Sequence, residues 1–217
     1  MKKLALPLLL LSGFAQAQSI SFNEVSVEYI KGDQDPNGHE VGTGRYEADV
    51  SHEQQQLEGA QLEVKAEIGS LFYVVGGYED ATADYDYLGY ESEITTQDIS
   101  LGFGVRTPLS QDVPDTTVYL EARANQLTYE FEDNSGSKED EDKTGQTLRV
   151  GVIMAPFDMF EVRPALSRLS GADELSSTAF ELGFLVRPMN EFGFSANFVE
   201  KVDLDQRRYE VGVVYKF

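Results

Sequence analysis

The chain is 217 residues long and holds 38 acidic against 17 basic residues, which gives a net charge of −21. An acidic chain of this kind repels the phosphates of nucleic acids, so that class of partner is excluded. The 41% hydrophobic content, with 11 tyrosines and 13 phenylalanines, argues against a disordered chain, and the absence of cysteine excludes a disulfide scaffold and a lipoprotein.

The N-terminus has the three parts of a secretory leader. Lys2 and Lys3 form a basic start, residues 4–11 form a short apolar stretch, and Ala15 and Ala17 complete an A-x-A cleavage signal. The apolar stretch is shorter than the roughly 20 residues that a membrane-spanning helix needs. The sequence therefore predicts a signal peptide over residues 1–17, cleaved after Ala17, and one all-β domain over residues 18–217.

Period-2 alternation of apolar and polar residues recurs along the mature chain and predicts strands with two differently solvated faces. Nine segments show it: residues 24–29, 61–68, 98–106, 118–125, 148–154, 160–167, 180–187, 192–199 and 208–217. Residues 71–78 are predicted as a tenth strand, but this segment is apolar on both faces, so its orientation is left open.

The connections between these segments alternate in length. Residues 69–70, 108–115, 156–158 and 188–190 are short or compact, whereas residues 31–56, 79–96 and 129–144 are long, polar and acidic. Short turns at one end and long loops at the other are typical of antiparallel barrels in an outer membrane. An even strand count then puts both termini at the short-turn, periplasmic end.

Alternation alone does not say which face lies outside, since a soluble lipocalin-like barrel would turn its apolar face inward. The polar faces carry nearly balanced charge, which suits a closed lumen in which each ion finds a partner. The expected lumen charges are nine acids, Glu24, Glu28, Glu63, Glu67, Asp98, Glu121, Glu161, Glu181 and Glu210, and eight bases, Lys65, Arg106, Arg123, Arg149, Arg163, Arg187, Arg208 and Lys216. We therefore expect the apolar faces to contact lipid.

The leader, the ten predicted strands and the aromatic C-terminus together resemble a small bacterial outer-membrane β-barrel of the OmpA, OmpX and porin-like kind, over the whole mature chain. In that group, a terminal phenylalanine preceded by alternate apolar residues is a signal read by the barrel-assembly machinery. The pattern maps here onto Tyr209, Val211, Val213, Tyr215 and Phe217.

The resemblance implies a place in the outer membrane of a Gram-negative bacterium, with membrane lipid and lipopolysaccharide as surroundings. The best-known members have eight strands, so eight strands with elaborated loops remain an alternative to ten. The chain has no tryptophan, so an aromatic girdle at the membrane boundary must consist of tyrosine and phenylalanine.

Residues with catalytic or metal-binding chemistry are few. The two histidines, His39 and His52, lie in the first long loop, and the neighbours of His52 cannot form a triad with it because adjacent strand residues point to opposite faces. A rim-site hydrolase is thus the weakest of the functional hypotheses, and no cofactor is expected.

Residues 33–38 match the opening of a calcium loop, but Gly44 stands where a bidentate Glu is needed. This segment is interpreted as a polar turn, and the acidic run 139–142 as a solvated loop tip. Clustered loop carboxylates facing lipopolysaccharide make divalent cations possible partners of the loops.

Two functional classes follow from the state of the lumen. In the first, ion pairs plug the barrel, which acts as a scaffold presenting acidic loops for adhesion or envelope integrity. In the second, inward glycines leave a narrow porin-like path for ions or small solutes; they are Gly102, Gly104, Gly151, Gly183, Gly193 and Gly212. Barrels of about eight strands have interiors just wide enough for side chains, so the scaffold is preferred.

Overall fold

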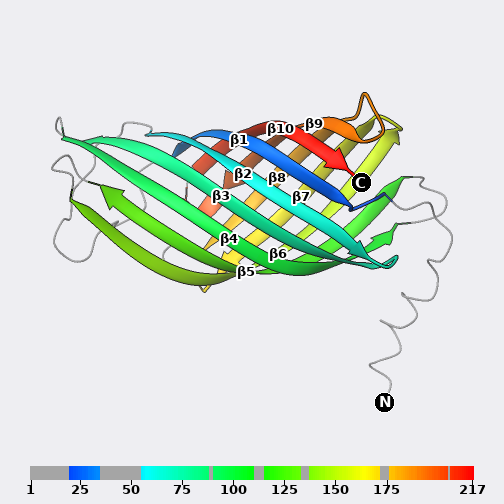
Figure 1. The fold of residues 1–217 in the computed structure, drawn as a ribbon, viewed down its shortest axis with the longest axis horizontal. Coiled ribbons are helices and arrows are strands. Elements are labelled where there is room, and N and C mark those ends of the chain that lie inside the picture. Colours follow the sequence, from blue (N-terminus) through cyan, green and yellow to red (C-terminus); the bar gives the residue numbers. More distant parts are fainter. Residues whose placement is uncertain are drawn as a thin grey trace, which may run out of the picture.

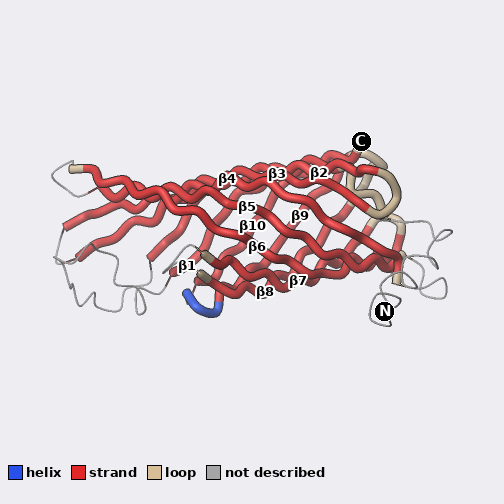
Figure 2. The backbone as a smooth tube through the Cα atoms, turned by 90° about the horizontal axis from the view of Figure 1, so that it is seen from below, coloured by secondary structure: helices blue, strands red, loops and turns tan. Residues whose placement is uncertain are grey.

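The computed structural model describes residues 20–34, 55–87, 90–109, 115–132, 137–171, 176–204 and 206–217. These residues form ten antiparallel strands that close into one barrel, as predicted (Figures 1 and 2). The strands are β1 (Glu24–Gln34), β2 (Gln55–Ile68), β3 (Phe72–Tyr87), β4 (Tyr90–Pro108), β5 (Thr116–Glu132), β6 (Lys138–Phe157), β7 (Phe160–Ser170), β8 (Ser177–Val186), β9 (Phe192–Lys201) and β10 (Gln206–Lys216). A 3-10 helix, η2 (Val202–Leu204), joins β9 to β10.

Each strand pairs with its neighbours in sequence, and β1 pairs with β10 to close the cylinder. Closure leaves no open sheet edge around the barrel, which is the condition for a β-structure inside a membrane. Glu24 at the start of β1 pairs with Lys216 at the end of β10, so β1 begins at the same end of the barrel at which β10 finishes. Within the described residues, no helix is long and apolar enough to cross a membrane.

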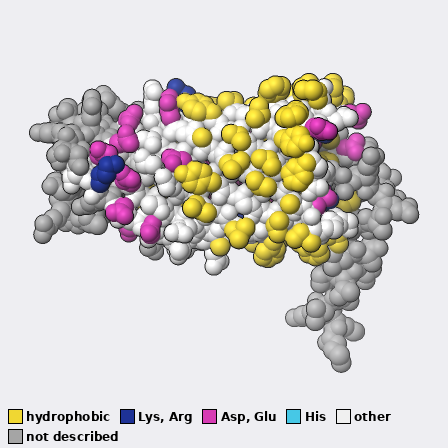
Figure 3. All heavy atoms as spheres, viewed as in Figure 1, with side chains coloured by type: hydrophobic (Ala, Val, Ile, Leu, Met, Phe, Trp, Pro, Cys, Tyr) yellow, Lys and Arg dark blue, Asp and Glu magenta, His cyan; other side chains and the backbone are white. Residues whose placement is uncertain are grey.

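The apolar faces point outward and the charged faces point inward. On β10, Tyr209, Val211 and Val213 are exposed, whereas Glu210 and Lys216 are buried. Apolar side chains cover the middle of the barrel and one of its ends in Figure 3, and we call this surface the apolar belt. A lipocalin-like barrel has the opposite arrangement, so that alternative is excluded.

The segment that is apolar on both faces, within β3, takes a definite orientation. Tyr73 and Val75 point inward and are fully buried, while Phe72 and Val74 point outward and are exposed. The inward pair faces glycines on the adjacent strand, because Tyr73 pairs with Gly104. Apolar residues therefore occupy the lumen at this point, where alternation of polarity could not assign a face.

Strands β3 to β6 contain 16, 19, 17 and 20 residues, against 10 to 14 in the other six. A membrane-crossing strand needs only about 9 to 11 residues, so these four continue well beyond the apolar belt. Figure 1 shows β3, β4 and β5 reaching past the rest of the barrel at one end, which we call the tall end. The structure thus corrects the prediction of long loops at 79–96 and 129–144, most of which is strand.

The opposite end, which we call the short-turn end, has tight connections. Gly69 adopts a left-handed φ of 77° in the turn between β2 and β3, a conformation that favours glycine. Residues 158–159 join β6 to β7, and residues 187–191 join β8 to β9. The first long loop, at residues 35–54, and residues 110–114 of the connection before β5 lie outside the described residues.

Candidate functional site

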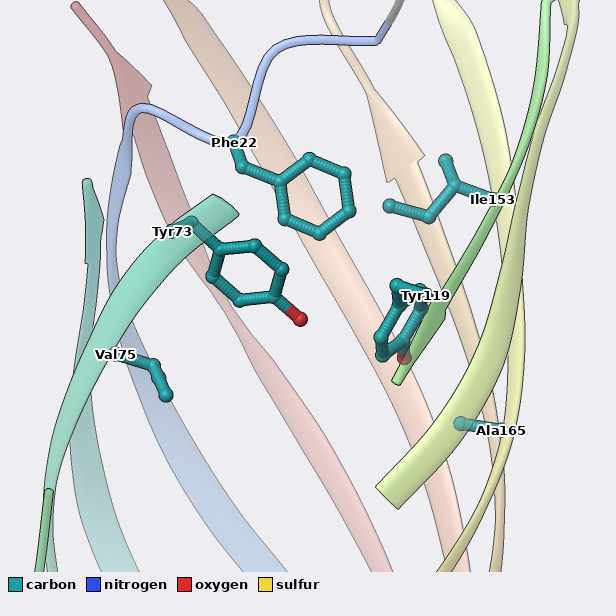
Figure 4. Close-up of a cluster of buried hydrophobic side chains, with 6 residues drawn as sticks. All are labelled: Phe22, Tyr73, Val75, Tyr119, Ile153 and Ala165. Atoms are coloured by element: carbon teal, nitrogen blue, oxygen red, sulfur yellow. The ribbon is translucent and has the colours of Figure 1, made fainter. Parts of the chain in front are cut away.

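The lumen has an apolar floor at the short-turn end. Phe22, which precedes β1, points into the barrel and packs among Tyr73, Val75, Tyr119, Ile153 and Ala165, a set that we call the floor cluster (Figure 4). The ring centroid of Phe22 lies 4.6 Å from that of Tyr73 and 5.8 Å from that of Tyr119. Only 1% of Phe22 is exposed, so neighbouring side chains surround it and the floor cluster is closely packed around its ring.

Backbone and side-chain hydrogen bonds hold the segment that carries Phe22. The Phe22 amide donates to Glu67 Oε1 at 2.6 Å, and the Glu67 amide donates to Asn23 Oδ1 at 2.8 Å. The Arg106 guanidinium donates to the carbonyl of Ile20, and its central carbon lies 5.0 Å from the centre of the Phe22 ring. The floor is thus fixed to β2 and β4.

Two of the inward glycines make room for tyrosine rings. A Cβ added at Gly104 would overlap the Tyr73 ring, and one added at Gly151 would overlap the Tyr119 ring. The Tyr73 hydroxyl donates to Glu121 at 3.0 Å, which fixes the ring across the lumen. At these two positions the space beside the glycine is filled by a tyrosine ring of the adjacent strand.

Above the floor cluster lies a connected set of ion pairs, which we call the lower network. It contains four carboxylates and five basic groups: Glu24, Glu63, Glu121, Glu161, Lys65, Arg123, Arg163, Arg187 and Lys216. Glu161 is fully buried and lies 2.7 Å from Arg163, 2.8 Å from Lys216 and 3.1 Å from Arg187. Arg163 also donates two hydrogen bonds to Glu24, at 3.0 and 2.9 Å.

A second set, the upper network, lies closer to the tall end. It contains three carboxylates, one guanidinium and two amides: Glu28, Glu79, Glu210, Arg208, Gln61 and Asn197. Arg208 contacts Glu79 at 2.6 Å and Glu210 at 2.8 Å. Gln61 and Asn197 each donate to both Glu28 and Glu210.

The remaining lumen charges form smaller groups. Arg149 pairs with Glu181, and Arg106 lies 2.8 Å from Glu67. Asp98 accepts two hydrogen bonds from Asn125, at 2.9 and 3.1 Å. Each of these groups joins strands that are adjacent or separated by one strand, so these contacts follow the inner wall of the barrel.

Between these networks lies a cavity of about 250 Å³. Its lining runs from Phe22 at the floor to Leu204 in η2 and includes all six residues of the upper network. At roughly 30 Å³ for each water molecule in the liquid, this volume corresponds to about eight waters. The interior is therefore closed at the floor and hollow above it.

The outer face of the tall end is acidic. Beyond the apolar belt, the outward side chains of β3 to β6 include one base, Lys138, and seven acids: Asp80, Asp84, Glu93, Glu130, Glu132, Asp140 and Asp142. Most acidic side chains visible in Figure 3 gather at this end. Lys138 contacts Glu130 and lies 3.0 Å from Glu132. We call this surface the acidic wall.

All seventeen residues proposed as lumen charges lie on the inner face. They are Glu24, Glu28, Glu63, Lys65, Glu67, Asp98, Arg106, Glu121, Arg123, Arg149, Glu161, Arg163, Glu181, Arg187, Arg208, Glu210 and Lys216, and each contacts a charged or amide group there. The proposed assembly-signal residues Tyr209, Val211, Val213, Tyr215 and Phe217 point outward.

Several other predictions fall elsewhere. Ala17, the two histidines and residues 35–38 of the calcium-like segment lie outside the described residues. Residues 139–142, interpreted as a loop tip, belong to β6. In the described part of the chain, no three His, Cys, Asp or Glu side chains come together as a metal site.

Three inward residues escaped the sequence analysis. Glu79 lay in a segment predicted as loop, Lys201 lay two residues past a predicted strand segment, and Phe22 preceded the first one. Each follows the same alternation as its strand, except Phe22, which has no periodic neighbour. Extending the inward register of β3 and β9 by one or two positions would have found Glu79 and Lys201.

No protein-family model matches the chain, and no curated protein sequence matches it. Solved structures with the same fold include the transport unit of the autotransporter AIDA-I from Escherichia coli, at 10% identity and a TM-score of 0.53, over 98% of this chain and 97% of that one. The translocator domain of NalP from Neisseria meningitidis matches at 13% identity and a TM-score of 0.51, over 89% and 88%.

The attachment invasion locus protein Ail of Yersinia pestis matches at 13% identity and a TM-score of 0.41, over 89% of this chain and 98% of that one. Identities this low establish the fold alone. With its outward apolar belt and inward ion pairs, the chain has the architecture of a small outer-membrane β-barrel.

Proposed function

We propose that the protein resides in the outer membrane of a Gram-negative bacterium and acts as a plugged, non-catalytic scaffold that presents acidic surfaces outside the cell. The signal peptide over residues 1–17 would direct export, and the C-terminal residues ending in Phe217 would engage the barrel-assembly machinery. The short-turn end would then face the periplasm and the tall end the exterior.

The observation that carries this proposal is the floor. A solute that entered the cavity from the tall end would meet the Phe22 ring, packed against two tyrosines and under the Arg106 guanidinium. Directly above, the lower network spans the lumen with buried carboxylates and bases in contact. Opening a path would separate these charges, and a separated buried charge is costly.

The acidic wall supports the surface role. Seven outward carboxylates and one lysine on the four-stranded extension form a negative surface beyond the apolar belt. A surface of that sign attracts cationic partners and steers their approach. Divalent cations that bridge lipopolysaccharide phosphates are one such partner, which would link the wall to envelope integrity.

A narrow channel is the second candidate, and the cavity above the floor favours it, because water already has room there. Planar-bilayer conductance distinguishes the two functions. The scaffold predicts no steady current for the wild type, and a steady step whose size follows the salt concentration would establish the channel.

Phe22→Ala supplies the internal control, since it removes the ring that fills the floor. We expect this variant to conduct or flicker, whereas Phe157→Ala, which changes an exposed ring at the same end, should stay as quiet as the wild type. If none of the three proteins conducts, the lower network alone would be enough to block the lumen, and Phe22 would not be needed for the block.

A further inference from the structure

The upper network has a charge deficit that the lower network lacks. Its three carboxylates, Glu28, Glu79 and Glu210, share a single base, Arg208, whereas the lower network sets five bases against four carboxylates. Asp98 and Lys201 line the same cavity, and with them the set holds four carboxylates and two bases. The set thus carries two more negative than positive charges, and an uncompensated charge inside a barrel is costly.

The deficit centres on Glu28. Only 5% of this residue is exposed, and its Oε2 atom accepts hydrogen bonds from the neutral amides of Gln61 and Asn197, the latter at 3.0 Å. Among the described residues, no basic side chain lies within 4.0 Å of its carboxylate. Glu210 Oε2 accepts from the same two amides, at 3.0 and 3.2 Å, so the two carboxylates converge on one point.

Gly212 makes this convergence possible. Glu28 lies on β1 and Asn197 on β9, with β10 between them. A Cβ at Gly212 on β10 would lie 2.6 Å from Glu28 Cγ. The Glu28 side chain therefore passes over β10 at a residue that has no side chain to obstruct it.

A second, independent feature points to a ligand at this place. Ser195 on β9 pairs with Gly212, directly beside the crossing of Glu28, and lines the same cavity. Its hydroxyl is buried, with 9% of the residue exposed, and has no hydrogen-bond partner in the described structure. A buried hydroxyl without a partner is uncommon and calls for an atom that the chain does not supply.

We propose that this part of the lumen binds one divalent cation, Ca²⁺, between the carboxylates of Glu28 and Glu210 and the hydroxyl of Ser195. The two missing positive charges match one such ion. Ca²⁺ takes six to eight oxygen ligands in flexible geometry, including carboxylates, amide carbonyls and water. Rotation of the Gln61 and Asn197 amides by 180° would turn their oxygens toward the ion, and water in the cavity would complete the set. The site is distinct from the carboxylates of the acidic wall.

The test is calorimetric titration of CaCl₂ into the EDTA-treated full barrel in detergent free of lipopolysaccharide, with thermal unfolding followed in parallel. The wild type should show one saturable site and a rise in melting temperature. Because ligand charge tunes calcium affinity over decades, Glu28→Gln should weaken that site by about tenfold or more. Ser195→Ala should weaken it by a smaller factor.

Glu191→Gln, an exposed acid at the short-turn end, makes the same chemical change and should titrate like the wild type. Without calcium, Glu28→Gln should be at least as stable as the wild type, which shows that it still folds. Equal calcium affinity in Glu28→Gln and the wild type would overturn the site. The site would also be overturned if the melting temperature of the wild type rose with falling pH and did not respond to calcium. That result would mean that Glu28 and Glu210 share a proton.

Discussion

Removing the charge of Glu161 is the sharpest perturbation of the lower network. This carboxylate is fully buried and is the contact shared by Arg163, Lys216 and Arg187. Glu161→Gln keeps the shape of the side chain but leaves five bases with three carboxylates. Arg187 loses its ion pair and retains its hydrogen bond to the carbonyl of Asp158.

The expected cost follows from what is left behind. Breaking a buried ion pair by neutralising one partner costs about 3 to 5 kcal/mol, because the other charge stays buried alone. Three bases lose a partner, but Arg163 and Lys216 still lie 2.9 and 3.9 Å from Glu24. Because these two bases keep a carboxylate nearby, we expect the cost to stay within about 3 to 5 kcal/mol. If water filled the lumen, solvent would screen the charges and the cost would fall to about 0 to 1 kcal/mol, as for an exposed pair.

Urea unfolding in phospholipid vesicles measures this free energy, with circular dichroism as the signal because the chain has no tryptophan. The matched control is Glu58→Gln, which neutralises an acid that lies 3.3 Å from Lys31 on the exposed outer surface. We expect Glu161→Gln to unfold about 3 to 5 kcal/mol more easily than the wild type and Glu58→Gln to lie within about 1 kcal/mol of it. Equal, small losses for both variants would refute a lower network whose paired charges are shielded from water.

Three further changes test other parts of the structure. Gly104→Ala should destabilise the barrel by about 1 to 3 kcal/mol, because the added methyl group would overlap the Tyr73 ring. Gly76→Ala should be neutral, since the nearest atom to its methyl group would lie 3.8 Å away. Equal urea midpoints for the two variants would disprove the packing argument. Leu101→Lys, in the middle of the apolar belt, should cost about 2 to 4 kcal/mol in vesicles, and Gln126→Lys at its edge about 0 to 1; a harmless lysine at Leu101 would mean that lipid does not contact this face. Deletion of Phe217 should lower the amount of surface-exposed, heat-modifiable barrel without affecting export, and normal surface levels would contradict its role in assembly.

Alternation of polarity was enough to predict the strand number and the two faces, because inside a membrane the contrast between lipid and lumen acts on every second residue. Alternation of polarity failed to predict strands in the parts of β3 to β6 that lie beyond the apolar belt. Around Glu79 and Tyr129 both faces are polar, so strands that rise beyond the lipid looked like loops.

Features that depend on distant partners were also out of reach. Glu24 and Arg163 are 139 residues apart, and their contact follows from closure and strand tilt, which set which side chains meet across the lumen. Phe22 gave no periodic signal, since a single residue ahead of the first strand has no alternating neighbours. Its role depends on Tyr73, whose face the sequence left open.

The central claim is that one side of each strand contacts lipid while the other side lines a lumen that the floor cluster closes, and adjacent cysteines on β3 test it directly. The chain has no native cysteine, Val74 points outward, and Val75 is fully buried in the floor cluster. We predict that Val74→Cys reacts with a lipid-soluble maleimide in vesicles and that Val75→Cys reacts with neither that reagent nor a charged, water-soluble one. Rapid labelling of Val75→Cys by the water-soluble reagent in the folded barrel would contradict a closed lumen.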